Sequence, residues 1–278
     1  MHITKRVWAL TGTMFLGALA LSLIYMYMQL HALPEVPKNA LNPLVAATHP
    51  GRMKLETDSR TTTFVPNQEI SIILSGDSKE VPVGGYDAVI NYDPSILEFV
   101  GAKSEMNDFD FFTTQKTNQI SLTASLKLTS SAAPLTDAIL ATLRFKTKKE
   151  GTTLMNFQYE LDATTDSNML SDKTKDVLGT VSDLTLVVGK KLSLTLNKPT
   201  EFEGKTFTLI EVSIPPATCN DCQSLVRIAV EENGKTEMLT YKNGGFVGLA
   251  EREKNIGTTV YRLEDANESA AIIIIGKK

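Results

Sequence analysis

Hydrophobic and polar residues alternate in short runs from residue 52 to residue 189, and clusters of Gly, Asp, Asn, Ser and Pro separate the runs. The runs read RMKLETDS, EISIILSG, YDAVINYD, ILEFVGA, QISLTASLKL, AILATLRFKTK, TLMNFQYEL and VSDLTLVVG. Such alternation is typical of strands with one buried face, and the region shows no sustained helical period. The pattern predicts an all-β domain at residues 52–189, built as an antiparallel sandwich.

The pattern restarts in residues 190–278 with the runs KLSLTLN, TFTLIEVSI, SLVRIAVEE, KTEMLTYK, TTVYRLED and SAAIIIIG. An NG pair at 233–234 and an NGG run at 243–245 lie between runs, and such residues favour hairpin turns. The isoleucine run at 272–275 is too short to cross a membrane and fits a central strand buried on both faces. We therefore expect a second, smaller β-sandwich or barrel.

Residues 7–30 read VWALTGTMFLGALALSLIYMYMQL and carry no charge. As a helix rising about 1.5 Å per residue, this segment would extend roughly 36 Å, enough to cross a hydrocarbon core of about 30 Å. Lys5 and Arg6 precede it, and the next Lys or Arg is Lys38. The positive-inside rule then places residues 1–6 in the cytoplasm and the domains outside the membrane.

The alternative for this segment is a cleaved signal peptide. Signal peptides have shorter apolar cores, of about 7 to 15 residues, and a small-x-small cleavage site. The LHA sequence at 30–32 supplies only one of the two small residues, so we interpret residues 7–30 as a retained transmembrane signal anchor. Residues 31–51 are rich in proline without a sustained period, and they are typical of an extended linker.

Composition and charge exclude several classes of function. The net charge is −4 and basic residues form no stripe, which argues against nucleic acid as a partner. His2, His31 and His49 all precede the predicted domains, so neither domain can hold a Ser-His-Asp triad or a histidine metal site. No nucleotide-binding loop is present. A carboxylate pair for glycoside hydrolysis is not excluded by composition, but nothing singles one out, and we expect no enzyme activity.

Cys219 and Cys222 are the only cysteines, in a CNDC sequence that follows two prolines. A zinc site would need a second pair of Cys or His ligands, which residues 190–278 lack. A redox motif needs its first Cys at a helix N-terminus rather than in a loop between strands. The remaining alternatives are two free thiols and a loop disulfide, which an extracellular setting favours.

Four motifs, in order, resemble the cohesin family. They are VINYDPSILEFVGA, ISLTASLKL, LATLRFKTKKEGTT and VLGTVSDLTLVVG, and they match the family's YDP-x-x-L-E element, A-S-L strand and L-A-T-L-x-F-K-x-K-x-x-G-T-T hairpin. The resemblance covers residues 52–189, which is about half of the chain. It implies a nine-stranded jelly-roll β-sandwich, similar to certain carbohydrate-binding modules, and a role in non-catalytic protein recognition.

The resemblance also implies where a partner binds. Cohesins of cellulosome-like systems bind a calcium-loaded dockerin module on one sheet face, and an Asn-x-Asp pair shortly before the YDP element contributes to that face. The matching positions are Gly85, Tyr86 and Asp87, so this chain retains the Asp and lacks the Asn. Because side chains alternate along a strand, Asp87 and Asn91 share one face and Tyr86 lies on the other. Asp87 and Asn91 are therefore candidate binding residues.

Three phenylalanines in the run NDFDFFTT form a second candidate site. Phe109, Phe111 and Phe112 lie among acidic residues, and an aromatic cluster of this kind can be a recognition tip. The alternative is that alternate phenylalanines of the run enter the core.

The run ELDATTDSNMLSDKTKD at 160–176 is rich in loop carboxylates, namely those of Asp162, Asp166, Asp172 and Asp176. Oxygen-rich loops can hold Ca²⁺, so calcium is kept as an alternative to the absence of any cofactor. The spacing departs from the twelve-residue EF-hand pattern, which needs a central Gly and a final Glu.

The sequence thus predicts a single-pass, membrane-anchored surface protein with its N-terminus in the cytoplasm. Its cohesin-like module would bind another protein, dockerin-like or from the envelope, or dock its own residues 190–278. The first alternative is a module that binds polysaccharide at the cell surface. Such modules present rows of Trp or Tyr, and the only Trp here is Trp8, within the predicted anchor. The second alternative is a structural part of an envelope or secretion assembly.

Overall fold

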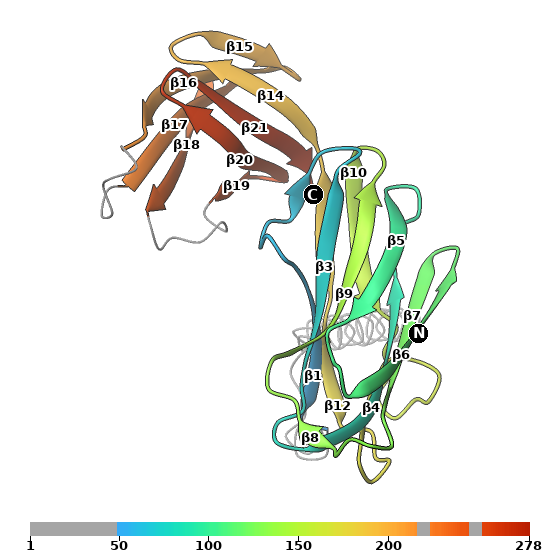
Figure 1. Ribbon diagram of the computed structural model, residues 1–278. Coiled ribbons are helices and arrows are strands. Elements are labelled where there is room, and N and C mark those ends of the chain that lie inside the picture. The colour runs from blue at the N-terminus through green and yellow to red at the C-terminus, as the bar shows by residue number, and fades with distance from the viewer. Residues whose placement is uncertain (1–48, 216–222, 245–251) are drawn as a thin grey trace, which may run out of the picture. The chain divides into compact units, whose positions relative to one another are not determined.

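The computed structural model describes residues 49–215, 223–244 and 252–278 (Figure 1). The predicted anchor, nearly all of the predicted linker, and both Cys219 and Cys222 lie outside the described residues. The described residues contain no helix with the length and apolar character that a membrane span requires. They fold almost entirely into strands, which confirms the all-β prediction for this part of the chain.

The region predicted to resemble cohesins is a sandwich of two sheets. One sheet has the order β12 (Leu178–Ser182), β1 (Gly51–Thr57), β3 (Glu69–Asp77), β9 (Ala138–Thr147) and β5 (Leu97–Ser104). The other has the order β2 (Thr63–Phe64), β13 (Leu184–Val188), β10 (Gly151–Phe157), β4 (Pro82–Asn91), β7 (Gln119–Leu126) and β6 (Phe109–Lys116). Two short strands, β8 (Ala133–Pro134) and β11 (Asn168–Ser171), also pair with β4.

The last long strand of this sandwich switches from one sheet to the other. Only Asp183 separates β12, which pairs with β1, from β13, which pairs with β10. The Asp183 carboxylate accepts a hydrogen bond from the Phe157 backbone N–H at 2.9 Å and so fixes the corner. The resemblance implies nine strands. The sandwich has nine if β12 and β13 count as one strand and the three strands of four residues or fewer, β2, β8 and β11, are set aside.

Two ladders of the sandwich are parallel, β1 with β12 and β2 with β13. The prediction of a purely antiparallel sandwich is therefore wrong at these two ladders. The physical reason is that a parallel pair needs a long crossover connection. Here the first and last strands of the sandwich lie side by side, and all the strands between them form that connection.

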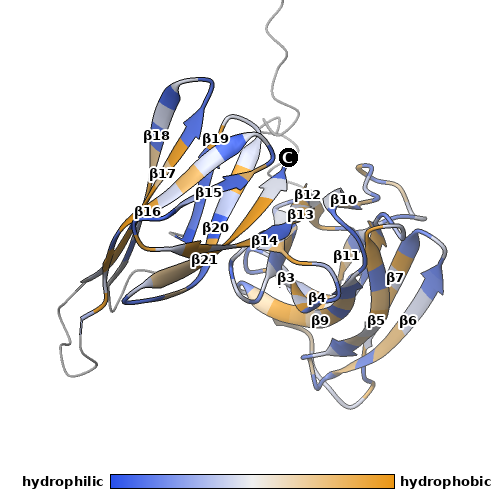
Figure 2. Cartoon of the chain, turned by 90° about the horizontal axis from the view of Figure 1, so that it is seen from above, coloured by the Kyte–Doolittle hydropathy of each residue, from blue (hydrophilic) through white to orange (hydrophobic). Residues whose placement is uncertain are grey.

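Alternation along β4 builds the core in the predicted way. Tyr86, Ala88 and Ile90 point inward and are buried, while Asp87 and Asn91 on the other face remain partly exposed. The Tyr86 hydroxyl donates a hydrogen bond to the Leu140 carbonyl at 3.2 Å, so its polar atom is paired inside the core. Bands of hydrophobic and hydrophilic residues alternate along strands of both sandwiches in Figure 2.

The YDP element forms the turn between β4 and β5. The Asp93 carboxylate accepts a hydrogen bond from the Ser95 N–H at 2.7 Å, and its carbonyl accepts one from the Ile96 N–H at 3.1 Å. The hydrogen bonds from Ser95 hold the pKa of the Asp93 carboxyl below its usual value. Asp93 thus caps a turn through its own backbone, as the motif chemistry predicts.

Residues 190–277 form a second sandwich of two four-stranded sheets. One has the order β14 (Lys190–Thr195), β21 (Ala270–Lys277), β20 (Thr259–Asn267) and β19 (Glu253–Ile256). The other has the order β15 (Pro199–Phe202), β16 (Lys205–Ser213), β17 (Gln223–Glu232) and β18 (Lys235–Gly244). Strand β21 lies between β14 and β20, and Ile273, Ile274 and Ile275 are buried, as expected for a central strand.

Tight turns with positive φ join the hairpins of this second sandwich. Asn233 (φ 53°) and Gly234 (φ 74°) connect β17 to β18, which is the hairpin turn that the NG pair predicts. The NGG run behaves differently, because Asn243 and Gly244 are the paired last residues of β18 rather than a tight turn.

Candidate binding surface

The outer face of β6, β7 and β4 carries a row of side chains in register. Phe112 of β6 lies opposite Thr123 of β7, which in turn lies opposite Asp87 of β4. Residues paired across neighbouring strands point to the same face of the sheet, so these three side chains share the surface. The next strand, β11, continues the row with Asn168 opposite Asp87.

Hydrogen bonds fix the polar part of this face. The Thr123 hydroxyl donates to Asp87 Oδ1 at 2.6 Å, which orients the carboxylate along the sheet. A second polar row lies four residues further along the strands, where Gln119 Nε2 donates to Asn91 Oδ1 at 3.2 Å and to Gln158 Oε1 at 2.9 Å. The surface therefore presents oriented polar side chains rather than freely rotating ones.

Phe112 is the exposed aromatic side chain of this face. It is 64% exposed, although its neighbours across the sheet are polar. Phe109, by contrast, is only 7% exposed and packs near Tyr86, with ring centroids 6.2 Å apart. Phe111 also points inward and packs against the core. The expected alternation thus places Phe109 and Phe111 in the core and Phe112 at the surface. Phe109 and Phe111 therefore do not contribute to the outer face of β6, β7 and β4.

Sequence reasoning named Asp87 and Asn91 as one candidate site and Phe112 as part of another. The register of β4, β7 and β6 places all three on one surface, which the sequence did not indicate, and other residues of this surface were missed. Leu154 of β10 is also exposed, and it points to the same face because Met155 and Phe157 of that strand are buried. Alternation in the run TLMNF was the signal that could have found it. Thr123 and Gln119 had no such signal, because their place beside Asp87 and Asn91 depends on strand register.

The absence of an Asn side chain at Gly85 has a steric explanation. A Cβ added at Gly85 would lie 2.8 Å from the backbone carbonyl oxygen of Ala124 on β7. Real Cβ atoms do not approach a backbone oxygen this closely, so β4 and β7 would have to separate to admit any side chain. The close approach of β4 and β7 at this point requires a glycine at position 85. Of the Asn-x-Asp pair expected before the YDP element, only Asp87 is therefore present.

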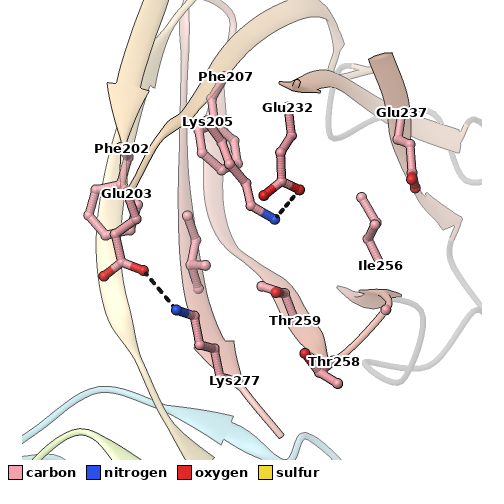
Figure 3. Close-up of a pocket in the computed structure, with 12 residues that line it drawn as sticks. Phe202, Glu203, Lys205, Phe207, Glu232, Glu237, Ile256, Thr258, Thr259 and Lys277 are labelled. Carbon is pink, nitrogen blue, oxygen red and sulfur yellow. Dashed lines mark ion pairs between the residues drawn. The ribbon is translucent and has the colours of Figure 1, made fainter. Parts of the chain in front are cut away.

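A cleft of about 430 Å³ lies in the second sandwich, at the end where three of its hairpin turns gather (Figure 3). Its apolar lining includes Phe202, Phe207 and Ile256. Figure 3 shows two ion pairs across its walls. One ion pair joins Lys205 Nζ to Glu232 Oε2 at 3.0 Å, and the other joins Lys277 Nζ to Glu203 Oε2 at 3.8 Å.

Two of the three carboxylates that line this cleft, Glu203 and Glu232, are paired with lysines, and Glu237 is the third. Lys205 also bonds the Tyr261 hydroxyl at 3.1 Å; burial opposes its charge, but the bonds to Tyr261 and Glu232 raise its pKa. A hydrogen bond from Lys190 likewise lowers the pKa of the Glu203 carboxyl. A ligand would have to break these pairs, so the cleft is a poorer candidate site than the face that carries Phe112.

Comparison with known proteins gives one family. Residues 66–182 match the family model described as the cohesin domain. No curated protein matches the chain. The solved structures that it resembles include CaCohA2 from Clostridium acetobutylicum, with 19% identity, 49% of this chain and 90% of that chain covered, and a TM-score of 0.40.

Two further solved structures have similar scores. One is a non-cellulosomal cohesin from the archaeon Archaeoglobus fulgidus, with 11% identity, 50% of this chain and 91% of that chain covered, and a TM-score of 0.40. The other is the Coh-OlpA–Doc918 cohesin–dockerin complex from Clostridium thermocellum, with 14% identity, 49% and 99% covered, and a TM-score of 0.38. The resemblance to cohesins predicted from the sequence is confirmed by the family-model match over residues 66–182.

Proposed function

Since residues 66–182 form a cohesin domain, we propose that this chain binds a dockerin-like protein module through the outer face of β10, β4, β7 and β6. Cohesins are non-catalytic binding modules, in keeping with the expectation that the chain is not an enzyme. The observation that carries the proposal is Phe112, an aromatic side chain 64% exposed beside an oriented row of polar groups.

The composition of the face supports a protein partner. Aromatic side chains are enriched among the residues that dominate protein–protein binding energy, typically at the centre of a patch with polar surroundings. Phe112 supplies such an anchor, and Leu154 adds a second apolar side chain on the same sheet. Asp87, held by Thr123, can accept hydrogen bonds from a partner without first being ordered.

The loss of Asn at Gly85 means that recognition differs in detail from the cellulosomal pattern. The acceptor Asp87 is retained, but no amide side chain can stand beside it. We infer that the exposed Phe112 provides binding energy that the amide supplies elsewhere in the family. A partner should therefore offer an apolar pocket for one aromatic ring, next to a hydrogen-bond donor for Asp87.

We also propose that residues 7–30 anchor this module to the cell membrane, with the β domains on the extracytoplasmic side. The support is the uncharged length of the segment and the basic residues before it. A proline-rich linker would hold the module away from the lipid surface. Such an arrangement suits a protein that displays or scaffolds partners at the cell surface.

Direct binding tests the interface. The full chain, purified in mild detergent, is measured by calorimetry against a panel of calcium-loaded dockerin modules, and by affinity electrophoresis against polysaccharides. We expect Phe112→Ala to weaken dockerin binding about 10- to 100-fold, which is the range of an interface anchor. Asp87→Lys should weaken it similarly, because it places a cation where a donor must approach.

The matched control is Ile139→Ala, which removes an exposed apolar side chain from the opposite sheet and should leave the affinity unchanged. Binding that is insensitive to both Phe112→Ala and Asp87→Lys would move the interface elsewhere. If no dockerin binds and a polysaccharide does, the carbohydrate-binding function replaces the proposal.

A further inference from the structure

Three buried oxygen atoms without a hydrogen-bond donor lie in the connection between β10 and β12. They are Asp166 Oδ1, Asn168 Oδ1 and Asp176 Oδ2. Asp166 is only 5% exposed and Asn168 only 7%, so bulk water does not readily donate hydrogen bonds to their buried oxygens. A buried acceptor with no partner costs about 1–3 kcal/mol, and more when it is charged. Three such acceptors within eleven residues need a common explanation.

Hydrogen bonds occupy the other polar atoms of these side chains and tie them together. Asp176 Oδ1 accepts from the N–H groups of Met169 and Leu178, at 3.1 and 3.0 Å. The second carboxylate oxygen of Asp166 accepts from the Glu160 N–H. Asn168 Nδ2 donates to the Asp166 carbonyl at 3.3 Å, which fixes the amide so that its oxygen is the unpaired end. Each side chain is thus held with one oxygen left over.

The negative charges gather around one tyrosine. The Tyr159 hydroxyl donates to the Leu178 carbonyl at 2.9 Å. Burial first, and then the nearby carboxylates of Asp176, Asp166 and Asp162, together raise the pKa of Tyr159 to about 12. Within the described residues, no Lys, Arg or His forms an ion pair with Asp166 or Asp176. Two partly or fully buried carboxylates therefore lack a compensating positive charge.

We propose that Asp166, Asn168 and Asp176 supply the side-chain ligands of a calcium site that fastens this connection to the sandwich. Ca²⁺ is bound by oxygen alone and accepts carboxylates and amide carbonyls together, with backbone carbonyls and waters completing six to eight ligands. Among the described residues no group of three Asp, Glu, His or Cys side chains could hold a metal. The proposed set is therefore two carboxylates and one amide, that of Asn168, whose Oδ1 is buried without a hydrogen-bond donor.

This set replaces the four carboxylates that the sequence suggested. Asp162 is exposed and bonded to His49 at 3.1 Å, and Asp172 is exposed. Neither has a buried oxygen left without a donor, whereas Asp166 and Asp176 do. The site belongs to this chain rather than to a partner, and Asn168 lies opposite Asp87 at the edge of the proposed binding face.

Calcium titration of the full chain tests this site. The protein is purified in mild detergent, stripped with EGTA and titrated with CaCl₂, and in a second arm with MgCl₂, up to roughly 10 mM, above the range of weak extracellular sites. We expect one Ca²⁺ per chain, weaker binding of Mg²⁺, and a rise in the thermal unfolding temperature with Ca²⁺. Asp176→Asn should lower the calcium affinity at least tenfold and remove most of that rise.

The matched control is Asp172→Asn, an exposed carboxylate of the same loop, which should bind calcium as the natural chain does. If Asp176→Asn fails to fold, Asn168→Asp serves instead: an added carboxylate should tighten calcium binding and lower the unfolding temperature in EGTA. The proposal is overturned if the natural chain shows neither calcium binding nor a calcium-dependent shift, or if Asp172→Asn loses as much affinity as Asp176→Asn.

Discussion

The outer face of β4, β6 and β7 and the cleft of the second sandwich use similar residues in opposite ways. Both combine phenylalanine with carboxylates, but in the cleft Phe207 is fully buried and two carboxylates, those of Glu203 and Glu232, are paired with lysines. On the outer face of β4, β6 and β7, the side chain of Phe112 is mostly exposed to solvent. The cleft in the second sandwich is therefore weaker evidence of a binding site than the exposed ring of Phe112, whose exposure does not stabilise the fold.

The largest expected effect separates the two phenylalanines. Phe207→Ala should destabilise the second sandwich by about 3–5 kcal/mol, because it leaves a cavity where the ring packs against Tyr261. Phe112→Ala should change stability by less than about 0.5 kcal/mol, as for other exposed substitutions. Denaturant unfolding followed by circular dichroism measures both. A large loss of stability in Phe112→Ala would mean that its ring packs against the protein and is not available to a partner.

A smaller effect concerns the glycine beside the binding face. Gly85→Asn introduces the Asn that the resemblance to cohesins implies at this position, but it places a Cβ against the Ala124 carbonyl. We expect a loss of about 1–3 kcal/mol of stability from the shift that this contact forces. Thermal and denaturant unfolding of this variant give the value. Asp87→Asn, one strand step away on the same face, is the control and should cost less. An unchanged midpoint in Gly85→Asn would show that the strands separate without strain and that the family's polar pair could be rebuilt here.

The local part of the site could be predicted from the sequence. Alternation along one strand is enough to place Asp87 with Asn91 and to separate Phe112 from Phe111, because the side-chain period of a strand is two residues. The turn at Asp93 follows from its own chemistry. In each case the cause lies within a few residues of the effect.

The non-local part could not be predicted, because it depends on register and on contacts between distant segments. Nothing in the run QISLTASLKL shows that Thr123 will orient Asp87, which is 36 residues away. The parallel ladders and the change of sheet at Asp183 likewise arise only when the ends of the sandwich meet. The loop carboxylates were noticed in the sequence, but burial alone distinguishes Asp166 and Asp176 from Asp162 and Asp172.

A modest effect is expected from the charges that line the cleft. Lys205→Met should cost less than about 1 kcal/mol, since Glu232 is half exposed and water can replace the lost pair. The same variant should bind dockerin modules as the natural chain does, if the binding face lies on the first sandwich. Denaturant unfolding of Lys205→Met measures its stability, and calorimetry measures its affinity for dockerin modules. A loss of dockerin affinity without a loss of stability would make the cleft part of the interface.

The smallest effect is a dependence on pH. The hydrogen bond from Lys190 lowers the folded-state pKa of Glu203 below 4.5, so its contribution to stability is present above that pH and is lost as the pH falls through the lowered value. Because Glu203 and Lys190 are both partly exposed, solvent screening should hold this contribution below about 0.5 kcal/mol. The measurement compares the natural chain with Glu203→Gln: the difference in their unfolding midpoints should be largest near neutral pH and low salt, and should shrink as the solution is acidified and Glu203 is protonated. A difference that instead grows as the solution is acidified would mean that the carboxylate opposes folding, and the cleft would then hold a strained charge in the manner of a binding site.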